Sequence, residues 1–333
     1  PERVSSGTYI HLTFPEYLLG LSATTIIAGD EGKREGEGKG EGKAEGKGEG
    51  GATEFLFDLG NEEAREFIFE YLSEAVTEYA LDVLRIDFNI DPGPYWSSND
   101  RENRTGMREI MYITGLYALW DKLLIAHPHL LIDDCSSGGR RIDVETLSRS
   151  FPLWRSDYSG QNDPTSLQSM SMGLSQFAPV SSGAVWDVDP YTWRSAGVVG
   201  KTISWGETKW RAIMASPPQL AMLKQAVNET QNLRHVALSG DYYPLTNGTQ
   251  QASVIDWAAY QFDVNGSDGF AFYFRNSNTS DTTMVSQLKG LAPASTYSVT
   301  LFYTYDQSGQ AQTMVGEQLS QMTITLSAPP ASL

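Results

Sequence analysis

The pattern of apolar and polar positions over residues 83–90 (VLRIDFNI) predicts a β-strand with two unlike faces, because alternate side chains of a strand point to opposite sides. One face is apolar and carries Leu84, Ile86, Phe88 and Ile90. The other face carries Val83 and then three polar residues, Arg85, Asp87 and Asn89. A buried strand with three polar side chains on one face is expected to present them to a site.

Helical patterns flank this strand. Asn61 is a typical helix cap, and the apolar positions from Ala64 to Tyr79 recur at helical spacing. The pattern predicts further helices over roughly 106–127, over 141–150 and near 208–235, and further strands over 130–135, 151–157, 172–180 and 198–205. This alternation with short connections predicts a parallel sheet in an α/β fold.

The pattern changes near residue 238. The segments DWAAYQFDV, GFAFYFRN, TMVSQLKGL, TYSVTLFYTYD and QMTITLSA are short, rich in β-branched and aromatic residues, and separated by turn residues. They predict an antiparallel β-sandwich. We therefore expect an α/β domain over residues 1–237 and a β-sandwich over 238–333. Residues 30–51, rich in glycine and in charges of both signs, are expected to be a flexible surface insertion.

Composition removes several classes of function. The formal net charge of −17 argues against nucleic acid as a partner, because binding phosphates requires a dense basic face. The apolar runs are too short for a membrane span. The single cysteine, Cys135, excludes an internal disulfide, and the four scattered histidines match no metal-ligand spacing. No metal and no cofactor are expected, and the compartment stays open.

Polar residues gather at three predicted strand ends. They lie in the segments Arg85–Asn89, Asp133–Gly139 and Trp154–Asp157, each of which holds a carboxylate. In parallel α/β barrels, function gathers at the C-terminal ends of the strands. Two carboxylates that converge there are the equipment for glycoside cleavage.

Each candidate also has a purely structural interpretation. Asp87 could form an ion pair with Arg85 that rigidifies the strand, and Asp157 could form a turn or cap a helix. The CSSGG segment could be a tight turn around a small buried thiol, and Trp154 could belong to the core. Cys135 is a weak candidate nucleophile, because no histidine is evidently placed to activate it.

The order and wording of the three segments resemble glycoside hydrolase family 36, the melibiase-like α-galactosidases. RIDFN, CSSGGRRID and LWRSD stand in the order of the family motifs KWDMN, CSSGGGRFD and WTSD. PERV, FPEYLL, SGDYYPL and LKGLAPASTYSV extend the resemblance over most of the chain. It implies a partial (β/α)8 TIM barrel, strands four to eight, followed by the β-sandwich.

The resemblance also implies roles for individual residues. Asp87 would be the nucleophile, and Asp157 the general acid/base, of a retaining exo-α-galactosidase. The sugar would be bound by Arg85, Asn89, Cys135, Ser137, Gly138 and Trp154. The implied partner is an α-galactoside oligosaccharide or glycoconjugate, and the chain could be a homo-oligomer.

The sequence departs from the family motifs in three ways. Arg85 stands where the family has lysine, Arg140 replaces a glycine of the turn, and Gly160 stands where the family usually has a second Asp, so α-N-acetylgalactosaminidase activity is an alternative. Residues 1–3 resemble the end of barrel strand three, so we expect strands one to three to be missing and the chain to be a truncated part of its family's catalytic domain. A non-catalytic carbohydrate-binding protein on the same fold is the competing hypothesis.

Overall fold

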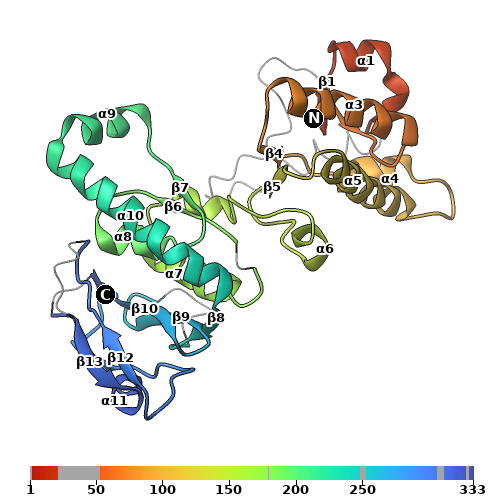
Figure 1. Cartoon of the computed structure of the whole chain (residues 1–333). Coiled ribbons are helices and arrows are strands. Elements are labelled where there is room, and N and C mark those ends of the chain that lie inside the picture. The colour runs from red at the N-terminus through yellow and green to blue at the C-terminus, as the bar shows by residue number, and fades with distance from the viewer. Residues whose placement is uncertain (1, 22–52, 179, 248–252, 306–310, 328–329) are drawn as a thin grey trace, which may run out of the picture. The chain divides into compact units, whose positions relative to one another are not determined.

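The computed structural model describes residues 2–21, 53–178, 180–247, 253–305, 311–327 and 330–333, and the predicted insertion at 30–51 lies outside them. The chain divides into two compact units, Pro1–Phe151 and Pro152–Leu333 (Figure 1). The predicted boundary at residue 237 separates an α/β part from an all-β part, whereas the two units are separated by their internal contacts. The boundary at residue 237 stays a prediction.

Unit 1 is the α/β part that carries the strand with two faces. Its elements are, in chain order, β1 (Arg3–Ser5), α1 (Tyr9–Thr13), the 3-10 helix η1 (Pro15–Tyr17), β2 (Leu18–Leu19), β3 (Glu54–Phe57), α3 (Glu62–Glu78), β4 (Val83–Phe88), α4 (Gly93–Asn99), α5 (Met107–Ala126), β5 (Leu131–Ser136) and α6 (Val144–Leu147). The strands β1, β3 and β2 form a small antiparallel sheet.

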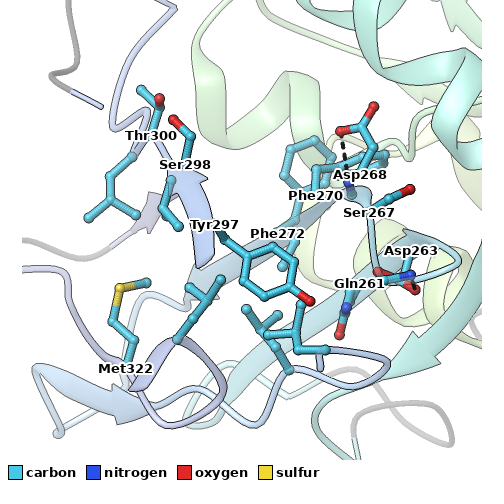
Figure 2. A pocket seen from close by; sticks show the side chains of 18 of the residues that line it. Gln261, Asp263, Ser267, Asp268, Phe270, Phe272, Tyr297, Ser298, Thr300 and Met322 are labelled. Atoms are coloured by element: carbon cyan, nitrogen blue, oxygen red, sulfur yellow. Dashed lines mark hydrogen bonds between the residues drawn. The ribbon is translucent and has the colours of Figure 1, made fainter. Parts of the chain in front are cut away.

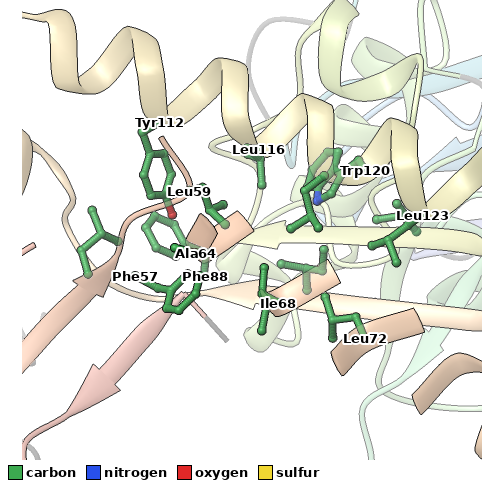
Figure 3. Packing of buried hydrophobic residues seen from close by; sticks show 14 of the residues in the cluster. Phe57, Leu59, Ala64, Ile68, Leu72, Phe88, Tyr112, Leu116, Trp120 and Leu123 are labelled. Carbon is green, nitrogen blue, oxygen red and sulfur yellow. The ribbon is translucent and has the colours of Figure 1, made fainter. Parts of the chain in front are cut away.

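The long helices α3 and α5 pack against the apolar face of β4. Ile68 and Leu72 of α3 and Leu116 and Trp120 of α5 are buried in one cluster with Phe88 (Figure 3). The close approach of α5 requires Gly115, because a Cβ there would lie 1.9 Å from the carbonyl oxygen of Leu59. The apolar side of the strand therefore faces the core, which leaves its polar side on the outside.

The parallel pairing of β4 with β5 confirms the predicted arrangement at this point. In the register of the two strands, Arg85 lies beside Asp133 and Asp87 lies beside Cys135. The predicted strand over 151–157 is wrong except at Phe151, which forms an isolated parallel bridge with Asp133. Pro152 follows it and lacks the backbone N–H that a strand ladder needs.

Unit 2 combines helices with one parallel pair of strands, β6 and β7, and with antiparallel strands. Its elements are, in chain order, the 3-10 helix η2 (Asp157–Gly160), α7 (Pro164–Leu174), β6 (Gly183–Val185), α8 (Pro190–Ser195), β7 (Lys201–Ile203), α9 (Glu207–Ala215), α10 (Pro217–Ser239), β8 (Asp241–Pro244), β9 (Trp257–Val264), β10 (Asp268–Arg275), β11 (Thr283–Val285), β12 (Thr296–Val299), β13 (Gln312–Val315), α11 (Gly316–Ser320), β14 (Thr323–Thr325) and β15 (Ala331–Ser332).

The predicted strand over 172–180 is wrong, because its first residues form the end of α7. The buried side of this helix is largely polar, so the apolar periodicity that would reveal it is absent. Gln168 donates a hydrogen bond to the Ser195 hydroxyl at 2.9 Å, and the Ser171 hydroxyl donates to the Leu167 carbonyl. The signal for the helix was its start, where Asp163 caps a first turn that begins with Pro164.

The helix predicted near 208–235 is two helices, α9 and α10. They meet at Ser216, and α10 begins with two prolines. A proline inside a helix removes a hydrogen bond and clashes with the preceding turn, whereas at the first helical position it is well tolerated.

The strands after residue 240 are antiparallel. The order β15-β10-β9-β8 makes one sheet, and the pairs β11–β14 and β12–β13 make two smaller ones. Val236 of α10 and Met172 of α7 share a hydrophobic cluster with Phe262 and Phe274 of the largest sheet. The helices α7 and α10, which precede this sheet in the chain, thus bury one of its faces. This packing explains why unit 2 extends across residue 237.

The N-terminal cap of α3 offers a test of this fold. The Asn61 side chain accepts hydrogen bonds from the backbone N–H groups of Glu63 and Ala64 at 3.0 and 3.4 Å. Asn61→Ala is expected to lower the free energy of unfolding by about 1 kcal/mol, because both donors lose their acceptor. Asn61→Asp keeps the acceptor and should cost much less. Denaturant unfolding measures the free energy of unfolding of both variants, and amide hydrogen exchange reports the local stability of α3. An equal loss in the two variants would contradict the assignment of Asn61 as the cap.

Candidate active site

The polar face of β4 is open to solvent. Arg85, Asp87 and Asn89 are exposed, whereas Ile86 and Phe88 between them are buried. The alternation arises because the intervening residues pack under α3 and α5. The strand therefore presents two charged groups and an amide in a row at its C-terminal end.

The guanidinium of Arg85 lies between two carboxylates. Its Nη1 is 2.6 Å from Oδ2 of Asp133, and its Nη2 is 3.5 Å from Oδ2 of Asp87. The structural alternative of an Arg85–Asp87 pair is thus present only as a long contact. The shorter bond goes to Asp133, a partner that the sequence analysis had not assigned to Arg85.

Cys135 lies beside Asp87 on the neighbouring strand and is buried. Burial raises the pKa of this thiol to about 11, and the nearby Asp87 carboxylate adds to the effect. The sulfur is therefore a neutral thiol near pH 7, which agrees with the prediction that Cys135 is a weak candidate nucleophile.

The turn after β5 is held in an uncommon backbone conformation. Ser137 and Gly138 have φ angles of 41° and 78°, in the left-handed region that favours glycine. The Ser137 N–H donates to the Phe88 carbonyl at 3.1 Å, so the turn is tied to the end of β4. Ser137 and Gly138 are thereby brought next to the strand that carries Asp87.

Trp154 and Asp157 contact each other in unit 2. The indole Nε1–H of Trp154 donates to Oδ1 of Asp157 at 3.0 Å. Asp157 is the exposed first residue of η2, and the Ser156 hydroxyl caps this turn by accepting from the Tyr158 N–H. Since the cap is Ser156, the Asp157 carboxylate is free of that structural task.

A buried arginine anchors the segment that carries these two residues. Arg155 is only 3% exposed, and its Nη2 donates to the Leu167 carbonyl at 2.9 Å and to the Ser171 hydroxyl at 3.0 Å. Burial lowers the pKa of Arg155 to about 10. A Cβ on Gly183 would lie 2.9 Å from the Ala196 carbonyl oxygen and 2.8 Å from the same nitrogen, so glycine is required there. Arg155, which lies between Trp154 and Asp157 in the sequence, thus anchors their segment to α7.

A second charged cluster lies on the core side of β4 and β5. Arg141 binds Glu2 through two bonds of 3.3 and 3.0 Å, and the Tyr112 hydroxyl donates to Glu2 at 2.9 Å. Asp134 is 3.7 Å from Arg141. Burial raises the pKa of Asp134 to about 7, against the opposing charge of Arg141. The carboxyl groups of Glu2 and Asp134 thus lie near one guanidinium, that of Arg141. The raised pKa of Asp134 favours its protonated form below pH 7.

The predicted site residues therefore fall into two groups. Arg85, Asp87, Asn89, Cys135, Ser137 and Gly138 gather at the ends of β4 and β5 in unit 1, and Trp154 and Asp157 pair in unit 2. Asp133 was missed as the partner of Arg85. The signal for it was its position two residues before Cys135, which puts both side chains on the same face of β5.

Unit 2 contains a cavity of about 900 Å³ (Figure 2). Its walls come mainly from β9, β10 and the segment 288–302. Two polar side chains in its wall serve the local fold. Gln261 exchanges two hydrogen bonds with the backbone of Lys289, and Asp263 accepts from the Gly266 N–H at 2.7 Å. None of the eight predicted site residues lines it.

Within the described part of the chain, no group of three or more acidic, histidine or cysteine residues is placed to hold a metal ion. Among the described helices, none is both long and apolar enough to cross a membrane.

The sequence of the chain is similar to those of known alpha-galactosidases. Residues 43–188, which include all eight predicted site residues, match the family model described as Melibiase. The chain is 29% identical over 128 residues to alpha-galactosidase 1 of Pediococcus pentosaceus (38% of this chain, 17% of the relative). It is 26% identical over 268 residues to a probable alpha-galactosidase C of Aspergillus flavus (74% and 32%). The chain thus spans a third or less of these curated relatives.

The fold resembles that of solved glycosidase structures. A form of the GH36 alpha-galactosidase AgaA from Geobacillus stearothermophilus, in complex with raffinose, matches with a TM-score of 0.74 at 19% identity, over 100% of this chain and 43% of that one. AgaB from the same organism matches with a TM-score of 0.73 at 20% identity, over 100% and 42%. At this identity the likeness concerns the fold.

The Asp134 cluster predicts a specific dependence of stability on pH. The pKa of Asp134 is about 7 in the folded chain and about 3.9 in an unfolded one, so the folded state loses stability as the pH rises from 4 to 7. Asp134→Asn removes this titration. Relative to the parent, the variant is expected to gain roughly 2–3 kcal/mol of stability between pH 5 and pH 8, because only the parent loses this stability over that range. Urea unfolding at the two pH values measures the difference, and an equal difference at both would refute the assignment.

Proposed function

Because this chain is a relative of the α-galactosidases of glycoside hydrolase family 36, we propose that it hydrolyses terminal α-galactosides with retention of configuration at the anomeric carbon. The observation that carries the proposal is the exposed polar end of β4, where Asp87 stands beside a guanidinium and a small buried thiol. We infer that β4, β5, the Phe151 bridge, β6 and β7 correspond to strands four to eight of a (β/α)8 barrel.

In the proposed mechanism Asp87 is the nucleophile. Its carboxylate oxygen attacks the anomeric carbon and displaces the leaving oxygen, which takes a proton from Asp157. A covalent galactosyl ester of Asp87 results. Water then attacks the anomeric carbon and gives a proton to Asp157, which frees Asp87 and releases the sugar. The Arg85 guanidinium, 3.5 Å from the Asp87 carboxylate, places a positive charge beside the attacking group.

The remaining candidates would bind the sugar. Arg85 and Asn89 follow the polar face of β4 on either side of Asp87 and would hydrogen-bond hydroxyl groups. Cys135, Ser137 and Gly138 would approach the ring edge, since the turn is tied to Phe88. Trp154 would wall the pocket while its indole N–H orients Asp157. Raffinose, which is bound by AgaA, is the substrate we propose to test first.

Removal of the nucleophile tests the proposal most directly. Asp87→Ala is expected to abolish hydrolysis of a nitrophenyl α-galactoside, and added azide should partly restore turnover by taking the place of the missing carboxylate. Asp82→Ala is the matched control, because Asp82 is an exposed acid at the opposite end of the same strand segment. Sugar binding without any turnover in the parent chain, unaffected by Asp87→Ala, would instead support a carbohydrate-binding protein.

The role of Asp157 predicts a dependence on the leaving group. Asp157→Ala should lower kcat/KM for raffinose by roughly 10²–10⁴-fold, because the sugar alkoxide needs a proton to depart. A nitrophenolate leaves without one, so the loss on the nitrophenyl substrate should be clearly smaller. Comparison of the two kcat/KM ratios checks the assignment. Equal losses on both substrates would show that Asp157 is not the acid.

A further inference from the structure

Asp133 is the inner neighbour of the proposed nucleophile on the polar face of β4 and β5. It pairs in register with Arg85, one step deeper than the pair formed by Asp87 and Cys135. Hydrogen bonds of the parallel ladder fix this register, so the relative places of the three charged residues are set by the backbone. The long Arg85 side chain can direct its guanidinium toward either carboxylate.

The two contacts of that guanidinium are unequal. Nη1 is 2.6 Å from Asp133, whose side chain is 4% exposed, and Nη2 is 3.5 Å from Asp87, whose side chain is 45% exposed. A charge pair is stronger at short distance and away from water. Burial acts to lower the pKa of Arg85, but the hydrogen bond and charge of Asp133 outweigh it and the pKa is raised. Arg85 is therefore bound chiefly to Asp133.

We propose that Asp133 is a positioning residue: it holds the guanidinium of Arg85 at the inner end of the polar face, so that the Asp87 carboxylate is not engaged by both of its nitrogens. This inference rests on the proposed role of Asp87 as nucleophile. A carboxylate clamped by two guanidinium N–H groups has its lone pairs occupied. A single contact of 3.5 Å keeps a cation nearby and leaves the oxygens able to attack.

Asp133→Asn tests this idea with little change of shape. Without the inner charge, Asp87 becomes the strongest remaining acceptor for Arg85, and the guanidinium is expected to move onto it. We expect kcat to fall roughly ten- to hundredfold, as for a small misplacement of a reacting group. The acidic limb of the kcat/KM profile should move to lower pH by roughly one unit, because the closer cation keeps Asp87 ionised.

Control variants separate positioning from general damage. A merely structural role would lower the amplitude of the pH profile without moving its limb. Asp133→Glu keeps a carboxylate and should leave the limb in place. Asp134→Asn changes the adjacent buried acid, which lies near Arg141 on the core side, and should also leave the limb in place. In an Arg85→Met background, Asp133→Asn should move the limb clearly less, since only the direct loss of the Asp133 charge then remains.

Cys135 provides a readout that does not need activity. It is the only cysteine of the chain, so its 13Cβ resonance gives one NMR signal, and the pKa of its thiol is about 11. If Asp133→Asn sends Arg85 toward Asp87, this pKa should fall by roughly one unit, and by clearly less in the Arg85→Met background, where only the direct loss of the Asp133 charge remains.

The two readouts distinguish the possible failures. An equal fall of the Cys135 pKa in both backgrounds, or an unmoved acidic limb in Asp133→Asn, would overturn the positioning role. An unequal fall in a chain whose hydrolysis is insensitive to Asp87→Ala would confirm that Asp133 places Arg85 and would refute the catalytic assignment of Asp87.

Discussion

The parallel pairing of β4 with β5 is the constraint on which the rest of the site in unit 1 depends. It places Arg85 beside Asp133 and Asp87 beside Cys135, and the turn that follows β5 is bonded back to Phe88. The helices α3 and α5 maintain this pairing by covering the apolar face of β4. A site built on a backbone ladder loses little conformational entropy when a ligand arrives, because its charged groups are already in place.

In each unit a buried arginine holds chain segments together, but the partners of the two arginines differ. In unit 1, Arg141 joins Glu2 to the core beneath the site. In unit 2, Arg155 is held by a carbonyl and a hydroxyl of α7. Burying a charged group costs free energy unless hydrogen bonds or an opposite charge compensate for the lost contact with water. Both therefore tie chain segments near the candidate carboxylates to their surroundings with directional bonds.

Much of the fold could be predicted from the sequence. The two faces of β4, the cap at Asn61 and the turn at Ser137 all follow from local patterns that the structure repeats. The failures have physical reasons. The buried face of α7 uses Gln168 and Ser171 in place of apolar residues, which conceals its period. The choice of Arg85 between Asp133 and Asp87 depends on burial across two strands, which no local pattern contains.

The neutral, buried thiol of Cys135 has a consequence for the chemistry of its surroundings. Oxidants and disulfides react with thiolates, and a thiol with a pKa of about 11 offers almost none near pH 7. No second cysteine exists in the chain to form an internal bridge. The carboxylate beside it is thus insulated from changes in redox potential, and the polar face of β4 keeps the same form in reducing and in oxidising surroundings.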